Sequence, residues 1–196
     1  MDFRPYDRQA LDLNARVIDQ ITAGQLDLPT PCAPWKVREL LSHMVSQHLR
    51  FGAVARGEDP ELACPLDKAE LGEDPAAVFR AASAGVTEAF AAGADEAVLL
   101  LPEIGRPVPL SMLISFHTFD FVVHGWDVAV SIGAPYAPAA ELSSLACEVG
   151  KLIPATSRIP GGSFAPVVEV GSDADELARL LGLAGRDPEW RPRARP

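Results

Sequence analysis

The segment Ser115–Ala129, SFHTFDFVVHGWDVA, places four titratable side chains in an otherwise apolar stretch. They are His117, Asp120, His124 and Asp127, and they stand among Phe, Val and Trp residues. At about 100° per residue in an α-helix, the four side chains fall within roughly 80° of one another. The rest of the helix surface is apolar, so we expect this polar seam to be buried. Burying ionised groups without partners is costly, so the seam must meet other polar groups.

Asp120 and His124 are four residues apart, which stacks their side chains on successive turns of one helix. With this spacing a single helix can offer two ligands to one metal ion. A catalytic zinc ion usually takes three protein ligands and keeps one position open. The spacing therefore indicates a metal site that needs a third ligand from elsewhere. For each histidine, a hydrogen-bonded structural role is the alternative interpretation.

The two histidines outside this segment are His43 and His48. A helix is expected from Trp35, and His48 lies on its apolar stripe. His43 is rotated by about 120° from the centre of that stripe. Glu39, one turn before His43, can accept the proton of its second ring nitrogen, as carboxylates do for metal-bound histidines. The third ligand is expected from this helix.

The composition excludes several classes of protein. The chain has 196 residues, with 17 Lys and Arg against 27 Asp and Glu, giving a formal net charge of -10. This charge argues against binding nucleic acid. The cysteines are Cys32, Cys64 and Cys147, an odd and widely spaced set that favours a reducing compartment over a disulfide framework. The start of the chain has no apolar signal segment and no run is suited to span a bilayer, so we expect a cytoplasmic protein without membrane partners.

Helical periodicity dominates the chain and predicts an all-α fold. Helices are expected over 7–21, from 35 onward, over 75–93, over 110–133, from 138 onward and over 173–185. Residues 164–170, FAPVVEV, are expected to form one short strand or an extended packing segment. These elements indicate a four-helix bundle with an additional C-terminal helix, in a single domain over 1–190. Residues 191–196, RPRARP, are expected to be a disordered basic tail.

Three blocks of the sequence resemble a known family. They are LPTPCAPWKVRELLSHMV at 28–45, FDFVVHGWDVAVSIG at 119–133 and FAPVVEVGSDADELARLLGLAGRDPEW at 164–190. The chain resembles the actinobacterial DinB/YfiT-like metalloenzymes, which are related to mycothiol-dependent maleylpyruvate isomerases and mycothiol S-transferases. The resemblance implies a four-helix bundle whose metal is held by His43, Asp120 and His124. Asp120 stands where several relatives have Glu or His, which implies a metal closer to this helix or one bound more weakly.

The resemblance also implies an activity. A divalent metal ion, Zn²⁺ first and Ni²⁺, Fe²⁺ or Mn²⁺ as alternatives, would activate the thiol of mycothiol or a similar small thiol for transfer to a small-molecule substrate, or for its isomerisation. Two alternatives remain open. One is a metal-dependent hydrolase on the same ligands, and the other is a bundle that binds metal or a small molecule without catalysis. Relatives in the family also imply a homodimer.

Three residues near these ligands have open or secondary roles. His117 can be a fourth ligand, a hydrogen-bonding partner of a ligand, or a base. Cys32 is interpreted as structural, because no base is tied to it by spacing. Asp127 is expected to orient a ligand or to join its helix to a neighbour through Arg38.

Overall fold

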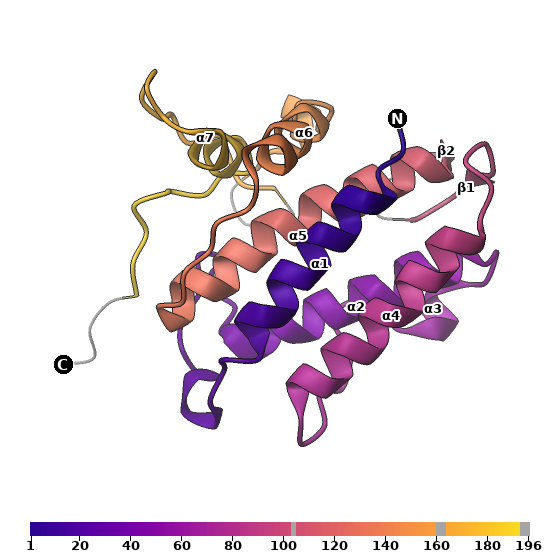
Figure 1. Ribbon diagram of the computed structural model, residues 1–196, viewed down its shortest axis with the longest axis horizontal. Helices are drawn as coiled ribbons and strands as arrows, with labels where there is room; N and C mark the ends of the chain where they lie inside the picture. The colour runs from indigo at the N-terminus through magenta and orange to yellow at the C-terminus, as the bar shows by residue number, and fades with distance from the viewer. Residues whose placement is uncertain (103–104, 160–163, 193–196) are drawn as a thin grey trace.

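The computed structural model describes residues 1–102, 105–159 and 164–192, and its helices are shown in Figure 1. The α-helices are α1 (Arg4–Ile18), α2 (Val37–Ala55), α3 (Pro60–Ala63), α4 (Pro75–Ala92), α5 (Leu110–Ile132), α6 (Ala140–Gly150) and α7 (Glu176–Leu183). Two short 3₁₀ helices, η1 (Ala23–Gln25) and η2 (Ala155–Ser157), lie in the connections. The strands are β1 (Val98–Leu99) and β2 (Val108–Pro109), which pair antiparallel.

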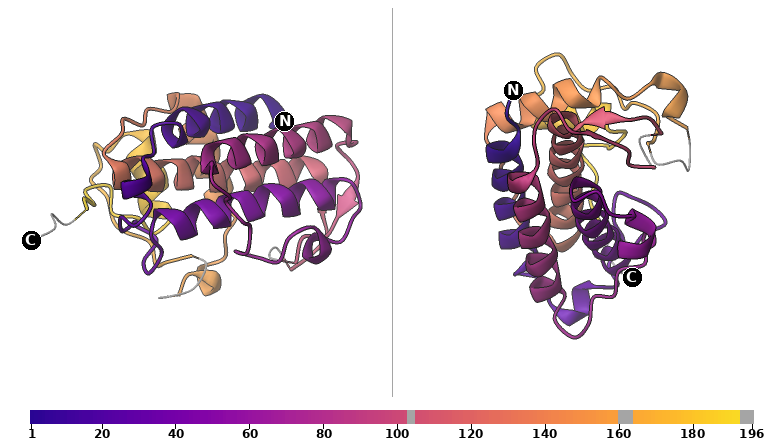
Figure 2. Two further views of the ribbon diagram at one scale, coloured as in Figure 1. Left: turned by 90° about the horizontal axis from the view of Figure 1, so that it is seen from below. Right: turned by 90° about the vertical axis from the view of Figure 1, so that its right-hand side faces the viewer.

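The four long helices α1, α2, α4 and α5 form the predicted bundle. Helix α1 packs against α4 and α5, and α2 packs against the same two helices, so each helix has two neighbours. The four run alongside one another in the left view of Figure 2. Apolar side chains from all four helices form one continuous core. The mainly helical prediction and the four-helix bundle are confirmed.

The bounds of the bundle helices follow from residues at their ends. Asp74 caps α4 by accepting a hydrogen bond from the backbone N–H of Ala77 at 2.9 Å, and Pro75 occupies the first turn. Helix α5 ends at Gly133, whose φ of 73° is left-handed. The predicted range 110–133 for this helix is therefore accurate.

The first helix differs from its prediction in position and in its buried face. It spans Arg4–Ile18 rather than 7–21, and Leu13 is only partly buried. Its buried side chains include the polar residues Asp7 and Asn14. A prediction from hydrophobic spacing assigns polar residues to the solvent-exposed side. It therefore placed the side of α1 that contacts the bundle incorrectly.

Helices α6 and α7, with the described residues around them from 140 to 192, form a smaller C-terminal unit against the bundle. Helix α6 packs against α5 and α7 packs against α6, as Figure 1 shows. Within the predicted strand 164–170, only Phe164 takes part in pairing, as an isolated bridge to Arg158. The remainder forms no strand, and the backbone N–H of Val168 donates to the carbonyl of Gly182 in α7 at 2.9 Å, so this segment packs against α7 instead of entering a sheet.

Two further differences concern short segments. Helix α7 begins slightly later than the predicted 173, because Asp175 caps it by accepting from the N–H of Ala178 at 2.8 Å. The β1–β2 hairpin is new, because two residues per strand are too few to give an alternating pattern. Of the expected tail 191–196, residues 193–196 lie outside the described residues. Among the described residues, no helix is long and apolar enough to cross a membrane.

Candidate metal centre

His43 on α2 and the Asp120/His124 pair on α5 meet where these two helices pack together. The rings of His43 and His124 lie with their centroids 5.0 Å apart and their planes at 73°. Asp120 Oδ1 is 3.4 Å from His124 Nε2, and Asp120 Oδ2 is 4.0 Å from His43 Nε2. One ligand atom from each of the three residues lies within 4.8 Å of the others. The structure therefore brings together the three side chains that the sequence singled out.

His43 is oriented by a carboxylate from the loop between α3 and α4. Its Nδ1 lies 2.6 Å from Asp67 Oδ1, which turns Nε2 towards Asp120. Asp67 has a left-handed φ of 59°. The expected partner Glu39 was wrong: its carboxylate accepts instead from the N–H of Lys36 at 2.9 Å and caps α2.

Two serines on α2 hold the loop that carries Asp67. Ser42 donates to the carbonyl of Ala69 at 2.7 Å, and Ser46 accepts from the N–H of the same residue at 3.0 Å. Ser42 and Ser46 are four residues apart on one side of α2, and together they engage both the carbonyl and the N–H of Ala69, two residues after Asp67. Periodicity carries no signal for a contact made by an irregular loop, so sequence reasoning missed Asp67.

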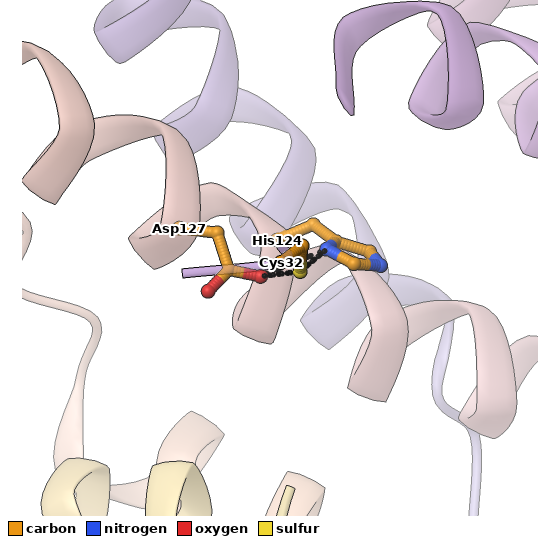
Figure 3. Close-up of side chains that lie close together, drawn as sticks. All are labelled: Cys32, His124 and Asp127. Atoms are coloured by element: carbon orange, nitrogen blue, oxygen red, sulfur yellow. Dashed lines mark hydrogen bonds and ion pairs between the residues drawn. The ribbon is translucent and has the colours of Figure 1, made fainter. Parts of the chain in front are cut away.

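His124 is oriented by Asp127, one turn later on α5. Its Nδ1 lies 2.9 Å from Asp127 Oδ2, and Cys32 Sγ donates to the same oxygen at 3.0 Å, as drawn in Figure 3. Arg186 Nη2 donates to it as well, at 3.1 Å. The predicted pairing of Asp127 with Arg38 was wrong, because Arg38 pairs with Asp27 at 3.1 Å. Sequence spacing indicated no partner for Cys32 either. In the structure it contacts Asp127, the carboxylate that orients His124.

The three convergent side chains fit a divalent cation. Asp120 Oδ2 is buried and has no hydrogen-bond partner among the described residues. Two ligand atoms on one tetrahedral zinc ion lie about 3.4 Å apart, which matches the 3.4 Å between Asp120 Oδ1 and His124 Nε2. The distance between His43 Nε2 and Asp120 Oδ2 is slightly larger, at 4.0 Å. An imidazole–imidazole–carboxylate set suits Zn²⁺ and leaves a position open for a small ligand.

The charged groups in the site shift one another's pKa values. Burial disfavours the charged form of His124, but Asp120 and Asp127 outweigh it and raise the pKa of His124 well above its usual value. Burial likewise opposes ionisation of Asp120, yet His124 and His43 lower the pKa of that carboxyl group. Without a metal, the two carboxylates thus favour the charged form of His124. A metal ion would replace the proton on Nε2 as the positive charge.

A second set of donor atoms, on Cys32, His124 and Asp127, also lies within 4.8 Å. Arg186 Nη2 already occupies this space, at 2.8 Å from Cys32 Sγ and 3.1 Å from Asp127 Oδ2. A guanidinium there supplies the positive charge that a cation would bring. Burial and the charge of Asp127 raise the pKa of the Cys32 thiol, which favours its protonated form. This set is therefore a hydrogen-bonded support for His124 rather than a second cation site.

His117 lies apart from these ligands in a buried cluster with Asp7 and His48. Its Nδ1 is 2.7 Å from Asp7 Oδ1, and its Nε2 is 3.1 Å from His48 Nδ1. Burial, together with the charge of His117, lowers the pKa of His48 well below its usual value, which favours its neutral form. With both ring nitrogens of His117 engaged, the geometry does not favour a fourth ligand or a base at the metal.

A surface pocket of about 310 Å³ adjoins the candidate site. Trp35 lines this pocket and also packs against the ring of His43, with centroids 4.8 Å apart. Asp27 and Lys36 supply charged groups to its wall. The pocket therefore offers an apolar ring and both signs of charge next to a candidate ligand.

Comparisons with known proteins identify the family and agree with the fold. Residues 8–129 match the family described as the mycothiol maleylpyruvate isomerase N-terminal domain. Two uncharacterized proteins of Mycobacterium tuberculosis, Rv0738 of strain H37Rv and MT0763 of strain CDC 1551, are each 31% identical over 184 residues, covering 91% of this chain and 96% of each relative.

A crystal structure of a histidine-to-alanine mutant of the mycothiol-dependent maleylpyruvate isomerase has the same fold. It is 12% identical in sequence, with a TM-score of 0.60 over 75% of this chain and 65% of that structure. The present chain thus spans slightly less than two thirds of that protein. By its family match and its sequence relatives, this chain belongs to the mycothiol maleylpyruvate isomerase N-terminal domain family.

Proposed function

We propose that this protein binds one divalent metal ion, Zn²⁺ in the first place, through His43, Asp120 and His124. The observation that carries the proposal is the convergence of these three side chains, with Asp120 Oδ2 buried and without a hydrogen-bond partner among the described residues. A buried carboxylate oxygen facing two imidazole nitrogens is best satisfied by a cation.

We further propose that the site uses a small thiol, mycothiol or a similar compound, in transfer or isomerisation. A divalent ion supplies a Lewis acid that lowers the pKa of a coordinated thiol or water. Support for a thiol comes from the family description and from the mycothiol dependence stated for the solved structure.

In this proposal, some residues of the chain hold the metal and others contact the substrates. Asp67 and Asp127 keep the Nδ1 protons of His43 and His124 engaged, which leaves both Nε2 atoms free as ligands. Asp120 is the most exposed of the three ligands, with 24% of its side chain accessible, so substrates reach the site on its side. The pocket beside Trp35 is suited to the part of a small polar molecule that does not react.

The test combines metal-loaded protein with mycothiol and a panel of electrophiles that includes maleylpyruvate and a bimane probe. We expect activity that requires both metal and thiol, and that falls to background in Asp120→Ala. Asp12→Ala, on the exposed side of α1, serves as the matched control and should keep full activity. Full activity in metal-free protein would contradict the proposal. Metal-dependent activity without a thiol would instead indicate hydrolysis on the same ligands.

A further inference from the structure

Arg186 reaches the candidate metal centre from the C-terminal unit, well beyond the residues 8–129 that match the family. It follows α7 in the chain, and only 9% of it is exposed. Its Nη1 donates to the carbonyl of Ala184 at 2.7 Å. Its Nη2 donates to Asp127 Oδ2 at 3.1 Å and to Cys32 Sγ at 2.8 Å. The guanidinium is thus held by the carbonyl of Ala184, two residues earlier, and it contacts Asp127, the carboxylate that orients His124.

Asp127 needs a positive partner because it is fully buried. Its exposed fraction is 0%, and a buried carboxylate without a counter-charge is strongly destabilised. Arg186 provides that charge on the same oxygen, Oδ2, that accepts from His124 Nδ1. The position of the His124 ring therefore depends on a carboxylate whose own position depends on Arg186.

We propose that Arg186 is a positioning residue of the metal centre, which fixes Asp127 and thereby holds His124 with Nε2 turned towards Asp120 and His43. The C-terminal unit then contributes a residue that the metal site needs, although this unit lies outside the residues that match the family. This inference rests on the proposed metal binding. Arg186 does not touch the metal or the substrate, and it acts through Asp127.

A purely structural role would be to tie the C-terminal unit to the bundle, and Arg158 allows the two roles to be separated. Arg158 Nη2 donates to the carbonyl of Gly150 at 2.9 Å, and its Nη1 donates to the carbonyl of Leu183. These bonds join α6 to α7 without contacting Asp127. Arg158→Met therefore loosens the same unit while leaving the contacts of His124 in place.

The experiment compares wild type, Arg186→Met, Arg186→Lys and Arg158→Met by two measurements. The first is zinc affinity from competition with a chelator. The second, made on metal-free protein, is the imidazole Nδ1–H resonance of His124 in ¹H–¹⁵N spectra, which a held ring protects from exchange with water. We expect Arg186→Met to bind zinc about 10–100-fold more weakly and to lose the resonance. Arg186→Lys should recover part of both, and Arg158→Met should match wild type in both.

Two results would overturn the inference. One is Arg186→Met binding zinc as tightly as wild type with the His124 resonance intact. The other is Arg158→Met weakening zinc binding as much as Arg186→Met does, which would leave only the structural role. If Arg186→Met does not fold, Arg186→Gln takes its place with the same expectations. If wild type binds no zinc, the proposed function fails, and the His124 resonance still decides whether Arg186 positions the ring.

Discussion

Asp67 Oδ1 lies 2.6 Å from Nδ1 of His43, and the same kind of contact recurs at the other candidate ligand, His124. There, Asp127 Oδ2 lies 2.9 Å from Nδ1 of His124. The two carboxylates come from unrelated places, a loop after α3 and the body of α5. In both cases the far ring nitrogen is engaged and Nε2 faces Asp120. Metal-binding histidines commonly have such a partner, which fixes the ring and raises its basicity.

The first prediction concerns the loop carboxylate. Replacing Asp67 by Gly should weaken zinc binding by about 10–100-fold, because His43 loses the group that orients it. Gly is the right replacement because Asp67 has a φ of 59°, a conformation that Ala would adopt only with strain. Asp67→Asn, which keeps an acceptor and tolerates this backbone, should lie between Gly and wild type. Chelator competition measures all three proteins, and equal affinity in Asp67→Gly and wild type would contradict the prediction.

The second prediction concerns acid stability and follows from Asp127. Burial opposes its ionisation, but the charges of Arg186 and His124 outweigh burial and lower the pKa of Asp127 to about 2. An aspartate in the unfolded chain has a pKa of about 4. A carboxyl group whose pKa is lowered by folding stabilises the fold above the unfolded-state pKa and loses this contribution as the pH falls. The expected loss between about pH 5 and about pH 2 is about 2 kcal/mol.

Urea titrations of metal-free wild type and Asp127→Asn at several pH values measure this contribution. The free energy of unfolding of wild type should exceed that of the variant near neutral pH, and the difference should shrink as the pH falls through the window. A difference that stays constant over this pH range would show that folding does not lower the pKa of Asp127, which contradicts the prediction.

The third prediction separates the buried cluster of His117 from the metal centre. Asp7 accepts from His117 Nδ1 at 2.7 Å and from Thr118 Oγ1 at 3.2 Å. Asp7→Ala leaves His117 Nδ1 buried without its acceptor, whereas Thr118 Oγ1 keeps the carbonyl of Ile114 at 2.9 Å. We therefore expect the free energy of unfolding to fall by about 3 kcal/mol. Zinc stoichiometry should stay at one per chain. Asp12→Ala is the control on the same helix, and a loss of zinc in Asp7→Ala would mean that His117 belongs to the site.

The bundle could be predicted from sequence because its helices are long and regularly patterned. Helix α5 has apolar residues nearly all round and ends at a glycine, so both its type and its bounds are determined locally. Asp120 and His124 share one face of this helix by spacing alone. The choice of His43 as third ligand needed the family resemblance as well, because His48 lies on the same predicted helix.

The residues that orient the ligands could not be predicted in this way. Asp67 is 24 residues from His43 and sits in an irregular loop, and Arg186 is 59 residues from Asp127. Such contacts depend on where the loop after α3 and the segment after α7 pack against the bundle. The spacing of apolar residues along the sequence does not determine that packing. Within the polar seam, spacing showed only that the four side chains share one face. It did not show that His117 meets Asp7 whereas Asp127 meets Arg186.

The most direct test of the metal centre is a crystal of the protein loaded with zinc and measured on both sides of the zinc absorption edge. We expect one anomalous peak per chain, about 2.0–2.2 Å from Nε2 of His43, Nε2 of His124 and the carboxylate of Asp120. The same data from Asp120→Ala should show the peak weakened or lost. A peak beside Cys32 and Asp127, or none near His43 in a fully loaded crystal, would contradict the proposed metal site.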